Sequence, residues 1–144
     1  MKIKIYVGCA LTHATEEYRK KIEGFKNMLR EKGFEVMDFL WAKLPDPRAP
    51  GIEKAVYEWD IEECVGKCDL FVAICDEVSI GMGYELGTAV EKYGKPAMAL
   101  IHKDGELTRV IRGITHPNFT YAQYENFEDA VNLVLKKAEN LSNI

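Results

Sequence analysis

The amino-acid sequence predicts an α/β fold, a doubly wound three-layer sandwich with a mostly parallel five-stranded sheet. Short apolar runs alternate with segments of helical spacing along the chain. The run 70–75 is apolar throughout, which is typical of a central parallel strand covered on both faces. Helix stop signals, such as Gly94 with Pro96 just beyond, separate the elements. This pattern indicates a flavodoxin or Rossmann-like arrangement, with residues 1–144 in a single domain.

Periodicity predicts the elements of the first half of the chain. Alternating apolar and polar residues indicate a strand over residues 2–7, which Gly8 ends. A helix over about 15–33 is expected from an apolar stripe that consists of Tyr18, Ile22, Phe25 and Leu29. A strand over 34–40 and a helix over about 52–66 follow. The proline-rich loop 43–51 between them is either a substrate wall above the sheet or a plain connector.

The second half continues the alternation of strands and helices. The strand over 70–75 leads into a glycine-rich turn and a helix over about 85–94. A strand over 97–101, a short helix over 108–112, a strand over 118–121 and a helix from Phe127 are expected next. In a doubly wound sheet, the loops after the first, third and fourth strands lie at one edge, where such folds bind ligands.

The composition limits the partners of the chain. It has 144 residues, of which 47% are hydrophobic and 29% charged, and a formal net charge of -4. A mildly acidic chain without a long basic run does not favour a nucleic-acid polymer, although a single nucleotide is compatible with it. No apolar run approaches the ~20 residues that span a bilayer, and the N-terminus does not resemble a signal peptide. We therefore expect a cytoplasmic protein without a membrane partner.

The four cysteines and three histidines show no metal-ligand spacing. Cys64 and Cys68 are four residues apart in a predicted helix, which matches neither a zinc knuckle nor a redox pair. We expect reduced thiols, no metal and no cofactor. A dinucleotide fingerprint is not predicted either, because Leu86 stands where the third glycine of GxGxxG would be.

The candidate chemistry centres on the stretch 79–87, Ser-Ile-Gly-Met-Gly-Tyr-Glu-Leu-Gly. Glu85 is expected in the first turn of its helix, where free amides and the helix dipole favour the ionised carboxylate that a nucleophile requires. Gly81 and Gly83 allow a ligand to approach the backbone, and the Ser79 hydroxyl is suited to a phosphate. The alternatives are a glutamate that only stabilises the helix and a turn-forming serine.

Glycosidic cleavage uses two carboxylates near one bond, and Asp60 is the candidate for the second. Its alternative role is that of a solvated residue on an amphipathic helix. Tyr6 and Trp41 either stack on a base or belong to the core.

The stretch 79–87, followed by Ala89-Val90 and Gly94-Lys95-Pro96, resembles the nucleoside 2-deoxyribosyltransferase superfamily. The likeness is strongest to its 2'-deoxynucleoside 5'-phosphate N-hydrolase branch. It extends to Tyr57-Glu58-Trp59-Asp60 upstream, to residues 107–113 downstream, and to the order of elements over almost the whole chain.

The resemblance implies a homodimeric N-glycosidase that acts on a small-molecule nucleotide or nucleoside. Glu85 takes the place of the nucleophile that attacks C1' of the deoxyribose, and Asp60 takes the place of the second acid. Ser79 matches a serine that binds the 5'-phosphate, and Thr108 matches a hydroxyl residue that reaches the phosphate from the neighbouring subunit. The residues expected to bind substrate are Tyr6, Gly8, Cys9, Thr12, Ser79, Gly81, Gly83 and Thr108.

The loop after the first strand departs from that branch. The hydrolases carry Gly-Ser-x-Arg there, whereas this chain has Cys9-Ala10-Leu11-Thr12. Loss of a charge-assisted contact weakens monophosphate binding by ~1.5–3 kcal/mol. The leading expectation is hydrolysis of a 2'-deoxynucleoside 5'-monophosphate. Base transfer between deoxynucleosides is one alternative, and a non-catalytic nucleotide-binding module is another.

Overall fold

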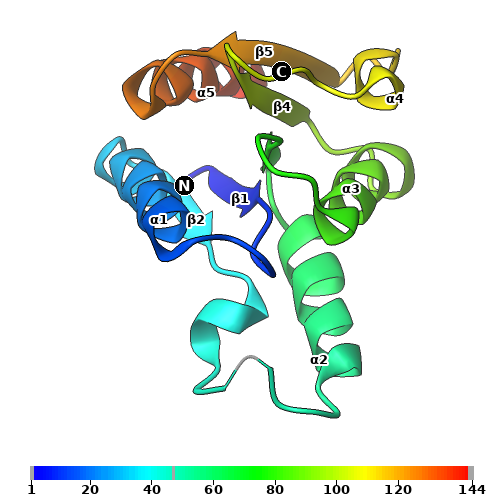
Figure 1. Ribbon diagram of the computed structural model, residues 1–144. Helices are drawn as coiled ribbons and strands as arrows, with labels where there is room; N and C mark the ends of the chain where they lie inside the picture. Colours follow the sequence, from blue (N-terminus) through cyan, green and yellow to red (C-terminus); the bar gives the residue numbers. More distant parts are fainter. Residues whose placement is uncertain (1, 47, 143–144) are drawn as a thin grey trace.

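A computed structural model describes residues 2–46 and 48–142 (Figure 1). One five-stranded sheet has the order β2-β1-β3-β4-β5. Every neighbouring pair in it is parallel, so the predicted doubly wound α/β class is confirmed and the sheet is parallel throughout. The strands are β1 (Lys4–Gly8), β2 (Glu35–Met37), β3 (Leu70–Ile74), β4 (Ala97–His102) and β5 (Phe119–Tyr124).

Helices cover both faces of this sheet (Figure 1). One face packs against α1 (Glu16–Glu31) and α5 (Phe127–Ser142). The other face packs against two helices that change geometry along their length. These are α2 (Glu53–Tyr57), which continues as the π-helical segment η2 (Glu58–Val65), and α3 (Ile80–Gly87), which continues as the π-helical segment η3 (Thr88–Lys92). A short helix, α4 (Arg109–Arg112), precedes β5.

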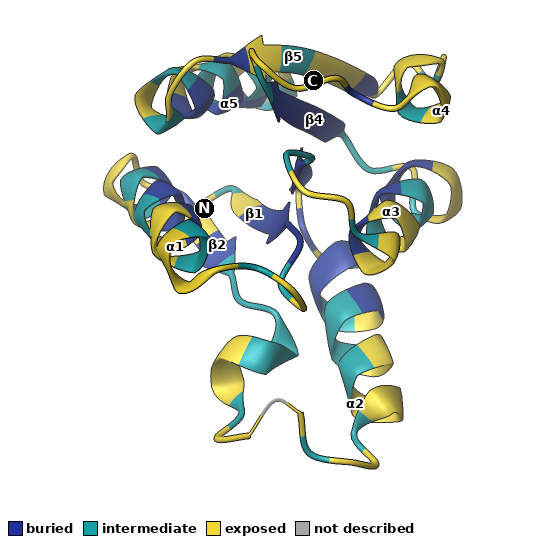
Figure 2. Cartoon of the chain, viewed as in Figure 1, coloured by how far each residue is buried: buried dark blue, intermediate teal, exposed yellow. Residues whose placement is uncertain are grey.

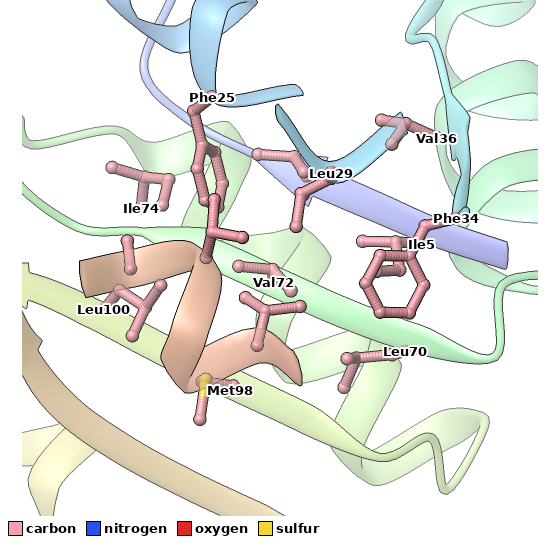
Figure 3. Packing of buried hydrophobic residues seen from close by; sticks show 14 of the residues in the cluster. Ile5, Phe25, Leu29, Phe34, Val36, Leu70, Val72, Ile74, Met98 and Leu100 are labelled. Atoms are coloured by element: carbon pink, nitrogen blue, oxygen red, sulfur yellow. The ribbon is translucent and has the colours of Figure 1, made fainter. Parts of the chain in front are cut away.

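Strand β3 explains why the sheet can be buried on both faces. Leu70, Val72 and Ile74 point to one side and pack with Phe25 and Leu29 of α1 (Figure 3). Phe71 and Ala73 belong to the core on the other side. Figure 2 shows a matching gradient along the second helix, which is exposed at α2 and becomes buried where η2 approaches the sheet.

The predicted ends of two strands are wrong: β5 continues to Tyr124, past the predicted residue 121, and β2 ends early. The chain leaves the sheet at Met37, so the strand predicted to reach residue 40 is shorter, and Leu40–Lys43 form a 3-10 helix, η1. The cause is non-local: the Asp38 carbonyl accepts a hydrogen bond from Trp59 Nε1, and the Leu40 amide donates one to the Asp60 carboxylate. These bonds attach the segment to η2 instead of to a neighbouring strand.

The order of the strands places the switch point of the sheet between β1 and β3, where successive connections pass to opposite faces. The chain leaves β1 toward α1 on one face, and it leaves β3 toward α3 on the opposite face. Ligands of such sheets bind beyond the carboxyl ends of the strands at this switch point. Within the described ranges, none of the helices is long and apolar enough to cross a membrane.

Gly8 ends β1 at this switch point, and packing alone requires it to be glycine. A Cβ atom at Gly8 would lie 2.7 Å from Cζ of Phe71, which is fully buried. We expect Gly8→Ala to lower the free energy of unfolding by roughly 1–3 kcal/mol in urea titrations, because overpacking forces side chains or backbone to shift. Gly24→Ala in α1 is the matched control. It has no atom within 4 Å of the new Cβ and should stabilise by about 0.5–1 kcal/mol. Equal effects of the two substitutions would contradict this account of Gly8.

Candidate active site

A cavity of about 450 Å³ lies at the switch point. The loop after β1 and the first turns of α3 form one part of its lining. Residues from 39–44 and 48–49, and the helix formed by α2 and η2, form the rest. Glu85 and Asp60 both line it, so the structure brings the two predicted acids into one cavity.

Glu85 lies in the second turn of α3, so its predicted place in the first turn is wrong. Ser79 is the N-cap, and its hydroxyl oxygen accepts a hydrogen bond from the Met82 amide over 3.1 Å. The glycine-rich stretch is therefore the first helical turn itself, and Ser79 has a capping role.

The protonation of Glu85 also differs from the prediction. Its pKa is raised from 4.5 to about 7: burial is the largest cause and raises it, the hydrogen bond from Tyr6 lowers it, and repulsion from Asp60 raises it. The electrostatic effect of the helix dipole falls off within the first turn, and Glu85 lies beyond that turn. Loss of hydration therefore decides the state of this carboxyl, and it titrates near neutral pH.

Tyr6 of β1 binds Glu85 from the sheet side of the cavity. Its hydroxyl donates a 2.6 Å hydrogen bond to Oε2 of Glu85, and its ring is 1% exposed and tilted against Phe71. Burial is the largest cause that raises the Tyr6 pKa well above its usual value, so the hydroxyl remains a donor. Tyr6 is a core residue that holds the acid, and it is not among the residues that line the cavity.

Asp60 lies in the π-helical segment η2, a geometry that is frequent at functional sites. Its Oδ1 atom accepts the Leu40 amide over 2.8 Å. Burial raises the pKa of Asp60, and the bond from Leu40 opposes that rise. Asp60 thus lines the cavity and also binds the first residue of η1. Its carboxyl has a higher affinity for a proton than an exposed aspartate has.

The other predicted residues are distributed as follows. Cys9, Thr12, Ser79 and Gly81 line the cavity, whereas Gly8 and Gly83 are not among its lining residues. Burial raises the pKa of the Cys9 thiol to about 11, so it is a neutral group at this wall. Thr108 is exposed at the N-terminus of α4, away from the cavity of its own chain.

The segment after β2 contributes a wall that the residues expected to bind substrate do not include, and Trp41, considered for stacking on a base, is part of it. Phe39, Trp41 and Leu44 line the cavity, and Arg48 lines it from the proline-rich loop. This contribution favours the substrate-wall interpretation of that loop over a plain connector. The sequence signal was the pair of aromatic residues directly ahead of the prolines.

A second cavity of about 420 Å³ adjoins the first, and Leu11, Thr12, Ser79 and Gly81 line both. Arg48 is the one arginine or lysine that lines either cavity among the described residues. Residues 2–46 and 48–142 contain no group of three or more His, Cys, Asp or Glu side chains placed to hold a metal ion. Three acids line the first cavity, of which Glu53 is exposed and Glu85 and Asp60 are partly buried among apolar side chains. A pair of partly buried acids suits proton transfer and nucleophilic attack.

The raised pKa of Glu85 predicts an unusual dependence of stability on pH. Between pH 4.5 and about 7 the unfolded chain releases a proton that the folded chain retains, so this group's contribution to stability falls as pH rises. Glu85→Gln carries no charge to bury and should be more stable than the parent by ~3 kcal/mol at pH 8, with little difference at pH 4.5. Urea unfolding across this range measures the effect. Glu16→Gln, at an exposed site on α1, is the control, and parallel curves for parent and Glu85→Gln would contradict the assignment.

No family model matches the chain, and no curated protein matches it by sequence. Among solved structures, the CMP N-glycosidase BcmB of Clostridium botulinum has 24% identity and a TM-score of 0.67, and the match covers 91% of this chain and 97% of that one. A 2-deoxyribosyltransferase from Bacillus psychrosaccharolyticus has 24% identity and a TM-score of 0.67, with 90% of each chain covered.

A lysine decarboxylase of Francisella novicida is similar at 13% identity and a TM-score of 0.52, but the match covers only 17% of that protein. The first two matches extend over nearly the full length of their chains, which is what a shared overall fold requires. The chain therefore has the nucleoside 2-deoxyribosyltransferase-like fold, as the resemblance of its sequence motifs implied.

Proposed function

We propose that the chain is an N-glycosidase that hydrolyses the base–sugar bond of a 2'-deoxynucleoside 5'-monophosphate through a covalent intermediate on Glu85. The observation that carries the proposal is the hydrogen bond from Tyr6 to a partly buried Glu85 in a cavity that also contains Asp60. The fold shared with a CMP N-glycosidase and a 2-deoxyribosyltransferase supports it.

In the first step, the oxygen of Glu85 that Tyr6 does not bind attacks C1' of the sugar. The C1'–N bond breaks, its electron pair leaves with the base, and Asp60 donates a proton to the base nitrogen. Burial of Asp60 favours this role because it raises the affinity of the carboxyl for a proton.

In the second step, the Asp60 carboxylate takes a proton from water, and the resulting hydroxide equivalent attacks C1'. The ester bond to Glu85 breaks, and its electron pair returns to the carboxylate, which Tyr6 stabilises by hydrogen bonding. The sum of both steps consumes one water and releases the base and a 2-deoxyribose phosphate.

The proposal assigns the 5'-phosphate to the region where the two cavities adjoin. The Ser79 hydroxyl accepts the Met82 amide and retains its own proton to donate to a phosphate oxygen. Arginine and lysine do not occur among Cys9-Ala10-Leu11-Thr12, so hydroxyl groups and backbone amides carry this recognition. In the proposed homodimer, the exposed Thr108 of the neighbouring subunit would add a further hydroxyl.

Base transfer is the second candidate function. It uses the same covalent intermediate, with a free base in place of water as the acceptor. The likeness to a 2-deoxyribosyltransferase, at the same identity and TM-score as the N-glycosidase, favours testing it directly.

Base release is the decisive measurement. Each deoxynucleotide and deoxynucleoside, with the ribose forms alongside, is incubated with the protein in the presence and absence of a second free base. We expect release from the monophosphate, at least ~1,000-fold slower in Glu85→Ala and ~100-fold or more slower in Asp60→Asn. Glu53→Gln, an exposed acid at the same cavity, is the matched control and should retain activity.

Each outcome of this experiment has a separate meaning. New nucleoside that forms only with added base would favour transfer. Tight binding without turnover of any substrate would indicate a nucleotide-binding module. A sugar trapped on a residue other than Glu85 would overturn the mechanism.

The pH profile of kcat/KM tests the role of Tyr6. Glu85 must be ionised to attack and Asp60 must be protonated to donate, so activity should rise with pH as Glu85 ionises, up to about 7, and fall on the alkaline side as Asp60 loses its proton. Tyr6→Phe removes the hydrogen bond that lowers the Glu85 pKa, and the acidic limb should move to higher pH. Tyr121→Phe, at a half-exposed site on β5, is the control. An unmoved limb in Tyr6→Phe would assign the titration to another group.

A further inference from the structure

Two aromatic residues of the cavity, Phe39 and Trp41, form what we call the aromatic wall. They lie beyond the end of β2, so the ladder of sheet hydrogen bonds does not fix them. Cations from α1 contact both rings, and Arg48 of the proline-rich loop also lies 5.9 Å from the centroid of the Trp41 ring. Helix α1 carries three basic residues on one face, Arg19, Lys26 and Arg30. Lys26 and Arg30 follow Arg19 by seven and eleven positions, which are close to two and three full helical turns.

Arg19 connects two parts of the cavity lining. Its Nη2 atom donates a 2.9 Å hydrogen bond to the Leu11 carbonyl, and its Cζ atom lies 5.4 Å from the centroid of the Trp41 ring. Leu11 and Trp41 both line the cavity, whereas Arg19 does not. The guanidinium therefore acts behind the lining, where its planar shape lets it donate to a carbonyl and lie against an indole at once.

Lys26 makes the equivalent contact with Phe39. It is 1% exposed, and its Nζ atom lies 4.1 Å from the centroid of the Phe39 ring. Its nearest carboxylate oxygen, on Asp38, is 3.9 Å away, and Arg30 binds the same oxygen over 3.1 Å. Burial of an ammonium is costly unless it is compensated, so this charge depends on the ring and on Asp38 for its stability.

We infer that Arg19 and Lys26 are positioning residues, which orient Trp41 and Phe39 to stack against the flat, uncharged heteroaromatic base of the substrate. The inference rests on the proposed function. A wall held in its binding orientation before the base arrives lowers the entropic cost of binding. It contributes equally to the ground state and to the transition state, so its loss changes KM and leaves kcat nearly unchanged.

The test compares Arg19→Lys and Lys26→Met with Lys20→Met. Lys26→Met keeps a long unbranched side chain, and Arg19→Lys keeps the charge but loses the planar fork. Lys20 is the matched control, because it is an exposed cation on the same helix whose partner is Glu16. We expect KM for base release to rise about 5–20-fold in the first two variants with kcat within about twofold, and no change in the control.

A second readout does not require turnover. Trp41 and Trp59 are the two tryptophans of the chain, so emission is recorded in the parent and in a Trp41→Phe background to isolate Trp41. Arg19→Lys should change the intensity or wavelength of the Trp41 emission, and it should weaken quenching by free adenine or cytosine several-fold.

The outcomes separate this inference from the proposed function. Absence of turnover in the parent, with Trp41 emission that still responds to Arg19→Lys and to free base, would reject the glycosidase and retain the positioning role. Parent-like KM and parent-like emission in Arg19→Lys would overturn the inference. If Lys26→Met does not fold, as judged by circular dichroism, the KM and the Trp41 emission of Arg19→Lys alone test the inference.

Discussion

The candidate site depends on one hydrogen bond, from the Tyr6 hydroxyl to the Glu85 carboxylate. Alternation along β1 directs Tyr6 to the face that α3 covers, while Ile5 and Val7 face α1. The sheet order places β1 beside β3, so α3, which follows β3, passes over the Tyr6 ring. Without this donor the partly buried Glu85 would have a still higher pKa, and a smaller fraction of it would be ionised at neutral pH.

Local pattern was sufficient to predict the class of fold, and it singled out two acids that the structure brings into one cavity. The apolar run 70–75 indicated a doubly covered strand, and the buried residues of β3 confirm it. The start of α3 was not predicted correctly, because a serine before glycines suits a turn as well as a helix cap. The state of Glu85 could not be predicted from its position in a helix, since it depends on burial by residues distant in sequence.

The segment after β2 shows a further limit of local reasoning. Its sequence favours continuation of a strand, but bonds from Trp59 to Asp38 and from Leu40 to Asp60 draw it toward η2. The proline-rich loop that follows thereby comes to line the cavity. These partners are about twenty residues away in the sequence and belong to a different element, so a local pattern does not reveal them.

The parallel sheet also governs how this site can come into existence. Every strand pair is parallel, so no hairpin forms locally, and each pairing waits for a crossover segment to be complete. Tyr6 and Glu85 are 79 residues apart in the sequence. They come into contact only after β1 has paired with β3, which requires the intervening segment to be complete. During synthesis, a nascent chain that ends before α3 holds a tyrosine without its acceptor and an aspartate without its partner acid. The contact between Tyr6 and Glu85, and the cavity that Glu85 shares with Asp60, therefore require a chain that extends through α3.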